Sequence, residues 1–284
     1  METSRSPKDI HVPLDTDTAP STITNDSQIS ISAQLAYWQS TSADVNGMLG
    51  GYPQISRIDI QFSRNFIRKL RRKYKETPES EPQKSTSLSN STVNPTMGRN
   101  YVFSHALEAG AGIGRVTLGL LVPLCAKIDI IEPVQKFTDV LTGPESPLVE
   151  NDQLGRVWNL PLQEWTVDSR PAYASIETPG SKYDLVYNQW CLNHLALSSL
   201  VAYFKSLILL LSPNGWIIVK ENLSTDAFGA DIFDPVDSSV TRSDANWRAA
   251  FKDAGLKIVH TELQTGFPKD LGLYPVRMYA LRPG

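Results

Sequence analysis

The string EAGAGIGR at residues 108–115 holds an acid, three glycines at alternate positions and an arginine. Because glycine tolerates positive φ and has no Cβ, the backbone at Gly110, Gly112 and Gly114 can turn sharply and let a small molecule lie against it. The next residues predict a helix, whose free N–H groups suit a carboxylate, a phosphate or a ribose oxygen. A dinucleotide fingerprint places its third glycine one residue later. The string therefore indicates a small-molecule site that is not a typical dinucleotide site.

A second acid, Glu132, follows the apolar run IDII at 128–131. That run predicts a buried strand, and ligands of open parallel sheets bind beyond the carboxyl ends of the strands. A carboxylate at such a point offers two acceptor oxygens, which suits the hydroxyls of a ribose. Leu162 and Gln163 follow the next predicted strand and would border an adenine with an apolar wall and an amide.

Further polar and aromatic residues follow the later predicted strands. Gln189, Trp190 and His194 come after one of them, and the string KEN, ending in Asn222, comes after the next. The acids of the following loop are Asp226, Asp231, Asp234 and Asp237. Their spacing does not fit a calcium loop, so we predict a negatively charged pocket mouth and no metal ion.

From residue 101 onward, apolar runs alternate with amphipathic runs, which predicts an α/β fold. We expect a Rossmann-like, mostly parallel sheet of seven strands, with helices on both faces and an antiparallel last strand. The strands are expected at 106–109, 128–131, 156–159, 183–188, 216–220, 256–263 and 276–281. A helix at 198–211 should end at the turn SPNG, residues 212–215.

The first 100 residues divide into three parts before this domain, which we place at 101–284. Residues 1–30 are rich in Ser, Thr, Asp and Pro and predict a disordered tail. Residues 31–74 predict a helical cap, in which Ile60, Phe66, Ile67 and Leu70 share one face of a basic amphipathic helix. We interpret the basic residues as a solvated face and not as a nucleic-acid site. The low-complexity run 75–100 predicts a flexible insertion.

Composition bounds the class of protein. Of 284 residues 41% are hydrophobic and 20% charged, which is typical of a globular protein, and the net charge of -3 argues against nucleic-acid binding. The two cysteines, Cys125 and Cys191, predict neither a disulfide framework nor a zinc site. No apolar run is long enough to cross a bilayer. We therefore expect a cytoplasmic, and also a nuclear, location without membrane contact.

Several strings together resemble the protein α-N-terminal methyltransferases over about residues 35–282. They are YW at 37–38, GMLGGY at 47–52, the glycine string, QW at 189–190 with His194, KEN at 220–222 and VDSSV at 236–240. The resemblance implies an EC 2.1.1 enzyme that uses S-adenosyl-L-methionine to methylate the free α-amine of proteins beginning Xaa-Pro-Lys or Xaa-Pro-Arg after Met removal. Such protein N-termini would be its partners, with ribosomal proteins as candidates.

The resemblance also implies roles for individual residues. Cofactor contacts are expected from Gly110, Gly112, Arg115, Glu132, Pro133, Val134, Leu162, Gln163 and Gln189, with Trp38 and Met48 near the methionine end. Trp190 should stack on the substrate proline, and the catalytic residues Asp237, His194 and Asn222 should surround the amine. The rest of the peptide should contact Asp234, Ser239, Tyr274 and Leu49. The sequence departs from the family in having Glu132 where Asp is common, a long insertion after Tyr74 and a longer loop at 222–237.

Methyl transfer mainly requires alignment and an available lone pair. Either His194 or Asp237 would accept the proton of the amine, directly or through water, with the Asn222 oxygen orienting it. Three other functions remain open: a small-molecule S-adenosylmethionine-dependent methyltransferase, a non-catalytic cofactor-binding module and, with poorer glycine spacing, a nicotinamide-dependent oxidoreductase.

Overall fold

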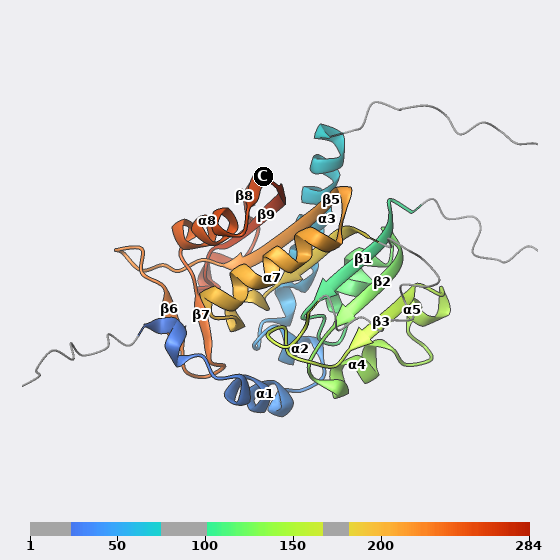
Figure 1. Cartoon of the computed structure of the whole chain (residues 1–284). Coiled ribbons are helices and arrows are strands. Elements are labelled where there is room, and N and C mark those ends of the chain that lie inside the picture. Colours follow the sequence, from blue (N-terminus) through green and yellow to red (C-terminus); the bar gives the residue numbers. More distant parts are fainter. Residues whose placement is uncertain (1–23, 75–100, 167–181) are drawn as a thin grey trace, which may run out of the picture.

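A computed structural model describes residues 24–74, 101–166 and 182–284. Seven strands in these ranges form one sheet in the order β3-β2-β1-β4-β5-β9-β8 (Figure 1). The parallel strands are β1 (Phe103–Ala109), β2 (Cys125–Ile131), β3 (Leu154–Trp158), β4 (Tyr183–Gln189) and β5 (Leu211–Asn222). The last strand, β9 (Val276–Pro283), runs antiparallel to both β5 and β8 (Leu256–Leu263). The predicted fold class is confirmed.

The register of the sheet decides where the site can form. Ala109 of β1 lies opposite Ile131 of β2 and Asn188 of β4, and Asn188 lies opposite Val219 of β5. The carboxyl ends of these four strands are therefore level, and the residues that follow them share one edge. That edge is where ligands bind in open α/β sheets.

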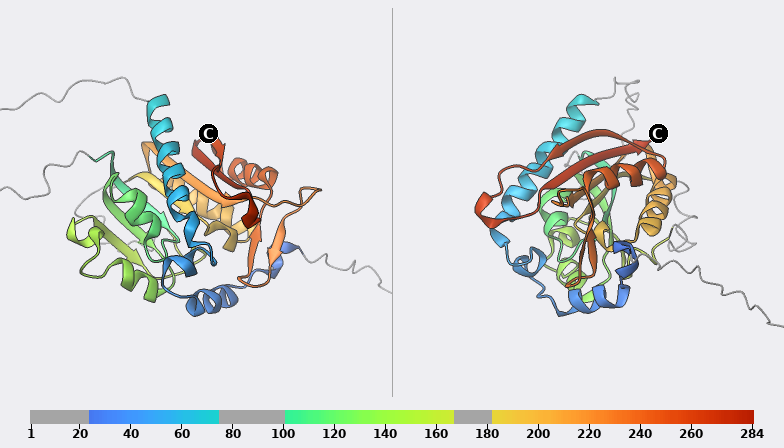
Figure 2. Two further views of the ribbon diagram at one scale, coloured as in Figure 1. Left: turned by 180° about the vertical axis from the view of Figure 1, so that it is seen from behind. Right: turned by 90° about the vertical axis from the view of Figure 1, so that its left-hand side faces the viewer.

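Helices cover both faces of the sheet (Figures 1 and 2). On one face lie α7 (Leu197–Leu210) and α8 (Asp244–Asp253), whose buried side chains share a core with β4 and β5. The other face is covered by α3 (Ser56–Lys73) and the π-helical turn η3 (Thr117–Leu121), with contributions from α4 (Gln135–Leu141) and α5 (Pro147–Glu150). The domain thus has three layers, helix on sheet on helix.

The N-terminal helices are η1 (Asn25–Gln28), α1 (Ile31–Ser40), α2 (Val45–Met48), η2 (Pro53–Ile55) and α3. α3 packs Phe66, Ile67 and Leu70 into the core beneath the sheet, so it is a layer of the domain and not part of a separate cap. The predicted tail is too long at its end, because residues 24–30 include η1 and the Asn25 side chain donates to the Asp231 carbonyl at 2.5 Å. Residues 1–23 and the insertion at 75–100 lie outside the described residues.

Several predicted strand boundaries differ from the structure, and the largest difference is at β5. This strand begins at Leu211, so SPNG at 212–215 lies within it, where a register shift against β4 absorbs the turn. Elements without a predicted range include α4, α5, α8, the hairpin of β6 (Ile232–Asp234) and β7 (Ser239–Thr241), and the short turns η5 (Leu192–His194) and η6 (Lys269–Leu271). No helix within the described ranges is both long and apolar enough to cross a membrane.

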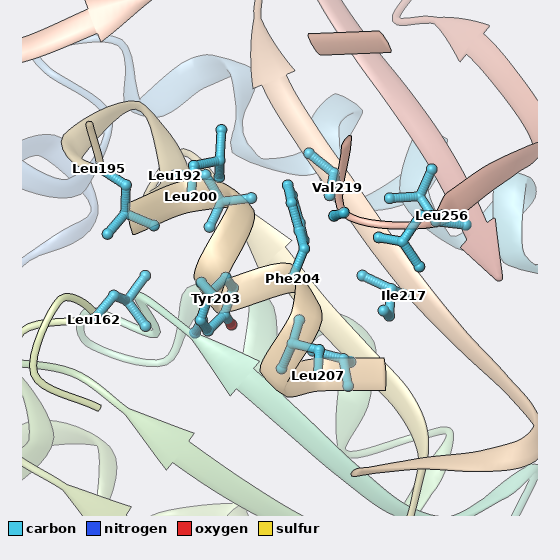
Figure 3. Close-up of a cluster of buried hydrophobic side chains, with 14 of the residues drawn as sticks. Leu162, Leu192, Leu195, Leu200, Tyr203, Phe204, Leu207, Ile217, Val219 and Leu256 are labelled. Carbon is cyan, nitrogen blue, oxygen red and sulfur yellow. The ribbon is translucent and has the colours of Figure 1, made fainter. Parts of the chain in front are cut away.

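Phe204 of α7 lies at the centre of the core that α7 and α8 share with β4 and β5 (Figure 3). Its substitution tests how much the packing of this core contributes to stability. Its side chain is fully buried, and its ring centroid lies 5.4 Å from that of Phe251. We expect Phe204→Ala to lower the free energy of unfolding by about 3–5 kcal/mol, because it removes buried surface and leaves a cavity. Leu209→Ala on the same helix is the matched control, since Leu209 is 67% exposed. Urea denaturation measures both, and equal effects would contradict this account of the core.

Candidate active site

A pocket opens at the carboxyl ends of the central strands, and residues of α1 line part of it. In Figure 1, α1 lies beyond these strand ends. It contains about 1010 Å³ of space, its open mouth included. Its lining is Ile31, Gln34, Leu35, Trp38, Met48, Glu108, Gly110, Ala111, Gly112, Arg115, Val116, Glu132, Pro133, Phe137, Pro161, Leu162, Gln163, Gln189, Trp190, Cys191, His194 and Leu195. All the predicted cofactor residues except Val134 are in this set.

The glycine turn after β1 forms one wall of the pocket. Gly110 and Gly112 have φ angles of 66° and 55°, which glycine adopts at little cost. A Cβ on Gly110 would lie 2.4 Å from Cys191 Cβ, and a Cβ on Gly112 would lie 2.6 Å from Met48 Sδ. Both glycines line the pocket, and having no side chain they do so with main-chain atoms.

Glu132 is fixed directly beside this turn. Its Oε2 accepts a hydrogen bond from the Gly112 N–H at 2.9 Å, and its Oε1 accepts one from the Val134 N–H at 2.9 Å. Burial raises the pKa of Glu132 to about 7, although both hydrogen bonds oppose the rise. Val134 is buried behind the acid, so the structure gives it the role of holding Glu132 instead of lining the pocket.

A buried charge cluster lies behind the pocket, and its centre is Asp59 of α3. One carboxylate oxygen of Asp59 accepts from Arg115 Nη1 at 2.6 Å, the other is paired with Lys220 Nζ, and Gln189 Nε2 donates to both. Burial would raise the pKa of Asp59, but Lys220 and Arg115 outweigh it and hold the pKa below its usual value. Burial lowers the pKa of Lys220 to about 8 despite the nearby acid. The cluster orients Arg115 and Gln189, both of which line the pocket.

Sequence reasoning missed Asp59, although a signal was present. The buried positions of α3 are Asp59, Ser63, Phe66, Ile67 and Leu70, which repeat with helical spacing. An acid in register with an apolar stripe must be paired if it is buried. The same argument applies to Gln34, which lies 5% exposed on α1.

The loop after β4 carries Trp190, and hydrogen bonds to Glu221 of β5 fix its position. Glu221 is fully buried, and its Oε1 accepts from the Cys191 and Leu192 N–H groups, both at 2.9 Å, while Oε2 accepts from Asn193 Nδ2 at 3.2 Å. Trp190 has a φ of 53°, and the Arg115 guanidinium lies 5.4 Å from its ring centroid. The loop thus presents the indole at the pocket wall.

α1 binds the end of this loop across the pocket. Trp38 Nε1 donates to His194 Nε2 at 3.1 Å, and Gln34 Nε2 donates to the His194 carbonyl at 2.9 Å. Gln163 Nε2 donates to that same carbonyl at 2.9 Å. Burial lowers the pKa of His194 even though the charge of Asp237 acts to raise it. His194 therefore lies in the pocket wall as a half-buried imidazole close enough to Asp237 to feel its charge.

The remaining predicted substrate and catalytic residues do not line this pocket. Asp237 is half-buried before β7, with Oδ1 accepting from the Ser239 N–H at 3.1 Å, and Asp234 is exposed at the end of β6. The pKa of Tyr37 on α1 is raised by burial and then by Asp237 and Asp234, so both acids face α1. The others outside the pocket are Asn222 at the end of β5, Ser239, Tyr274 and the buried Leu49.

Comparisons with known proteins decide the class. Residues 26–282 match the family model of AdoMet-dependent proline di-methyltransferases. The chain belongs to this family. It is therefore an S-adenosylmethionine-dependent methyltransferase, as the resemblance implied.

Similar proteins agree with that assignment. The chain is 34% identical to the Schizosaccharomyces pombe alpha N-terminal protein methyltransferase 1, over 87% of this chain and 93% of that protein. It is 34% identical to the Xenopus tropicalis N-terminal Xaa-Pro-Lys N-methyltransferase 1, over 87% and 92%. A solved SAM-dependent methyltransferase from Leishmania major superposes with a TM-score of 0.66 at 30% identity, over 88% of this chain and 82% of the other.

The charge cluster gives a stability prediction for this methyltransferase. Asp59→Asn leaves Arg115 and Lys220 buried without a counter-charge, so we expect the free energy of unfolding to fall by about 3–5 kcal/mol. Asp59→Asn/Lys220→Met restores part of the loss, because it removes one of the two cations. Lys69→Gln, which removes the exposed partner of the Lys69–Glu262 pair and leaves Glu262 with His260, is the control and should cost less than about 1 kcal/mol. Urea denaturation measures all three variants. If Asp59→Asn lowers the free energy of unfolding no more than the control does, the cluster does not contribute to stability.

Proposed function

We propose that this protein transfers methyl groups from S-adenosylmethionine to the free α-amine of proteins that begin Xaa-Pro-Lys or Xaa-Pro-Arg after Met removal. The observation that carries the proposal is the position of Trp190 and His194 in one pocket with the glycine turn and Glu132, next to the acids of the β6–β7 hairpin. The relatives from fission yeast and frog, named as an alpha N-terminal protein methyltransferase and an N-terminal Xaa-Pro-Lys N-methyltransferase, support it.

The pocket has the features that S-adenosylmethionine requires. Glu132 offers fixed acceptor oxygens for the ribose, the glycine turn leaves its main chain uncovered, and Arg115 offers a cation for the methionine carboxylate. Phe137 and Leu162 give an apolar wall for the adenine. The bound cofactor supplies an electrophilic methyl group on a sulfonium.

The acceptor side of the site suits a short basic N-terminus. Trp190 presents a flat indole on which a proline ring can pack, as we propose for the second residue of the substrate. Asp237 and Asp234 supply negative charge near α1, which would stabilise and steer a Lys or Arg at the third position. On the family resemblance, we also propose Ser239, Tyr274 and Leu49 as peptide contacts and Asn222 as the residue that orients the amine.

An α-amine is a favourable acceptor at neutral pH. Its reference pKa of about 7.7–8.0 means that losing a proton at pH 7 costs roughly 1.4 kcal/mol, whereas a lysine amine near 10.4 costs about 4.6 kcal/mol. A pocket with modest proton-accepting groups therefore favours the chain terminus over lysine. We further propose ribosomal proteins among the substrates, and a cytoplasmic and nuclear location, on the family resemblance.

The direct test is mass spectrometry of a synthetic Ser-Pro-Lys peptide and its N-acetylated twin after incubation with the protein and S-adenosylmethionine. We expect methyl groups on the free peptide and none on the acetylated one, because acetylation removes the amine lone pair. A Ser-Pro-Glu peptide should react at least about tenfold more slowly through repulsion by the acids. Equal methylation of the acetylated peptide, or none of the free one, would contradict the proposal.

Trp190 gives a second test. We expect Trp190→Ala to weaken binding of the Ser-Pro-Lys peptide by about tenfold, because an aromatic contact at the centre of an interface is lost. Trp190→Phe should retain most of the affinity. Calorimetry with the peptide measures this, and calorimetry with S-adenosylhomocysteine checks that the cofactor site survives. Unchanged peptide affinity in Trp190→Ala would refute the stacking role.

A further inference from the structure

The contact between Trp38 and His194 determines which imidazole nitrogen carries the hydrogen. The two atoms, Trp38 Nε1 and His194 Nε2, lie 3.1 Å apart, and the rings meet edge to face with centroids 6.0 Å apart. An indole N–H donates and never accepts. Nε2 of His194 must therefore be the unprotonated nitrogen, and a neutral ring must carry its hydrogen on Nδ1.

The other nitrogen of His194 is left without a partner. Nδ1 is buried and has no hydrogen-bond partner among the described residues, and the residue lines the pocket. A buried N–H without an acceptor is costly, so pockets that contain one usually complete it with a ligand or an ordered water. A neutral ring with this tautomer therefore carries a buried Nδ1–H that no described residue accepts.

Two opposing effects act on the pKa of His194. Asp237 in the β6–β7 hairpin favours the imidazolium, and burial, which favours the neutral ring, outweighs it. From α1, Trp38 donates to the ring, and the ring of the titratable Tyr37 packs edge to face against that of Trp38. From the loop at 161–166, the uncharged Gln163 donates to the carbonyl of His194. The charged groups that line the same pocket are Arg115, Glu108 and Glu132.

We infer that Trp38 is a positioning residue that holds His194 as the neutral tautomer protonated on Nδ1, so that Asp237, and not His194, accepts the proton of the substrate amine. This inference rests on the proposed function and decides between the two proton acceptors that the sequence leaves open. An Nε2 that already accepts from an indole offers its lone pair to that N–H and not to an ammonium group.

The chemistry of the transfer favours a neutral histidine. When the amine nitrogen bonds to the methyl carbon, the carbon–sulfur bond breaks, its electron pair stays on sulfur, and the positive charge passes from sulfur to nitrogen. A proton lost by the nitrogen goes to the Asp237 carboxylate, directly or through water. A charged imidazole beside this nitrogen would repel the cation, and the Trp38 N–H prevents that charge from forming on Nε2.

NMR of protein labelled with ¹⁵N-histidine tests the inference without any turnover. We expect His194 of the wild type to show a protonated Nδ1 and an unprotonated Nε2 at pH 8. In Trp38→Phe, the ring loses its donor, so we expect a mixture of tautomers and a titration midpoint about 0.5–1 pH unit higher. Tyr37→Phe is the matched control, since it removes a neighbouring hydroxyl but leaves the indole, and it should keep the wild-type tautomer. A wild-type His194 protonated on Nε2 would overturn the inference.

Kinetics with the Ser-Pro-Lys peptide give a second, independent readout. His194→Gln keeps an acceptor for Trp38 and a donor for the pocket, so we expect kcat to fall less than about tenfold. Asp237→Asn removes the proton acceptor, and we expect kcat to fall at least about tenfold while S-adenosylhomocysteine binds normally. A loss of 100-fold or more in His194→Gln with little loss in Asp237→Asn would also overturn the inference. Absence of wild-type turnover would instead refute the proposed function and leave the NMR result to decide the tautomer.

Discussion

The buried ion cluster around Asp59 is the interaction on which the rest of the site depends. It joins α3, on one face of the sheet, to Arg115 after the glycine turn, Gln189 at the end of β4 and Lys220 near the end of β5. A cluster with two cations and one anion carries excess positive charge within the protein. The cofactor's methionine carboxylate, which we place beside Arg115, would balance that charge, so cofactor affinity and the position of α3 are linked.

A second set of contacts closes the pocket from the N-terminal side. α1 reaches over the strand ends and bonds through Gln34 and Trp38 to the main chain and ring of His194. Gln34 also donates to the Ser238 carbonyl, and Ser238 Oγ accepts from the Ser30 N–H, both at 2.9 Å. One helix thereby contacts the pocket wall at His194 and the acidic hairpin at Ser238. The N-terminal segment thus positions residues of the proposed active site.

Sequence patterns predicted the sheet well, because buried parallel strands require continuous apolar runs that end abruptly at polar residues. They also placed Glu132 beside the glycine turn, since both must follow neighbouring strands. The patterns failed where polar groups are buried by distant partners: Asp59, Gln34 and Glu221 look like surface residues until their partners are known. The hairpin holding Asp234 and Ser239 was missed because its strands have three residues each, too few for an alternating pattern to register.

The sequence alone could not predict how close the acidic hairpin lies to the substrate amine. That distance depends on how α1, β5 and the loop after β4 pack against one another. We propose that one pocket aligns a sulfonium donor with an unblocked chain terminus. A crystal structure with S-adenosylhomocysteine and an unmethylated Xaa-Pro-Lys peptide would show this alignment directly. We expect the amine nitrogen between the cofactor sulfur, His194 and Asp237, with the proline on Trp190. A peptide bound away from Trp190, or with its amine pointing out of the pocket, would contradict it.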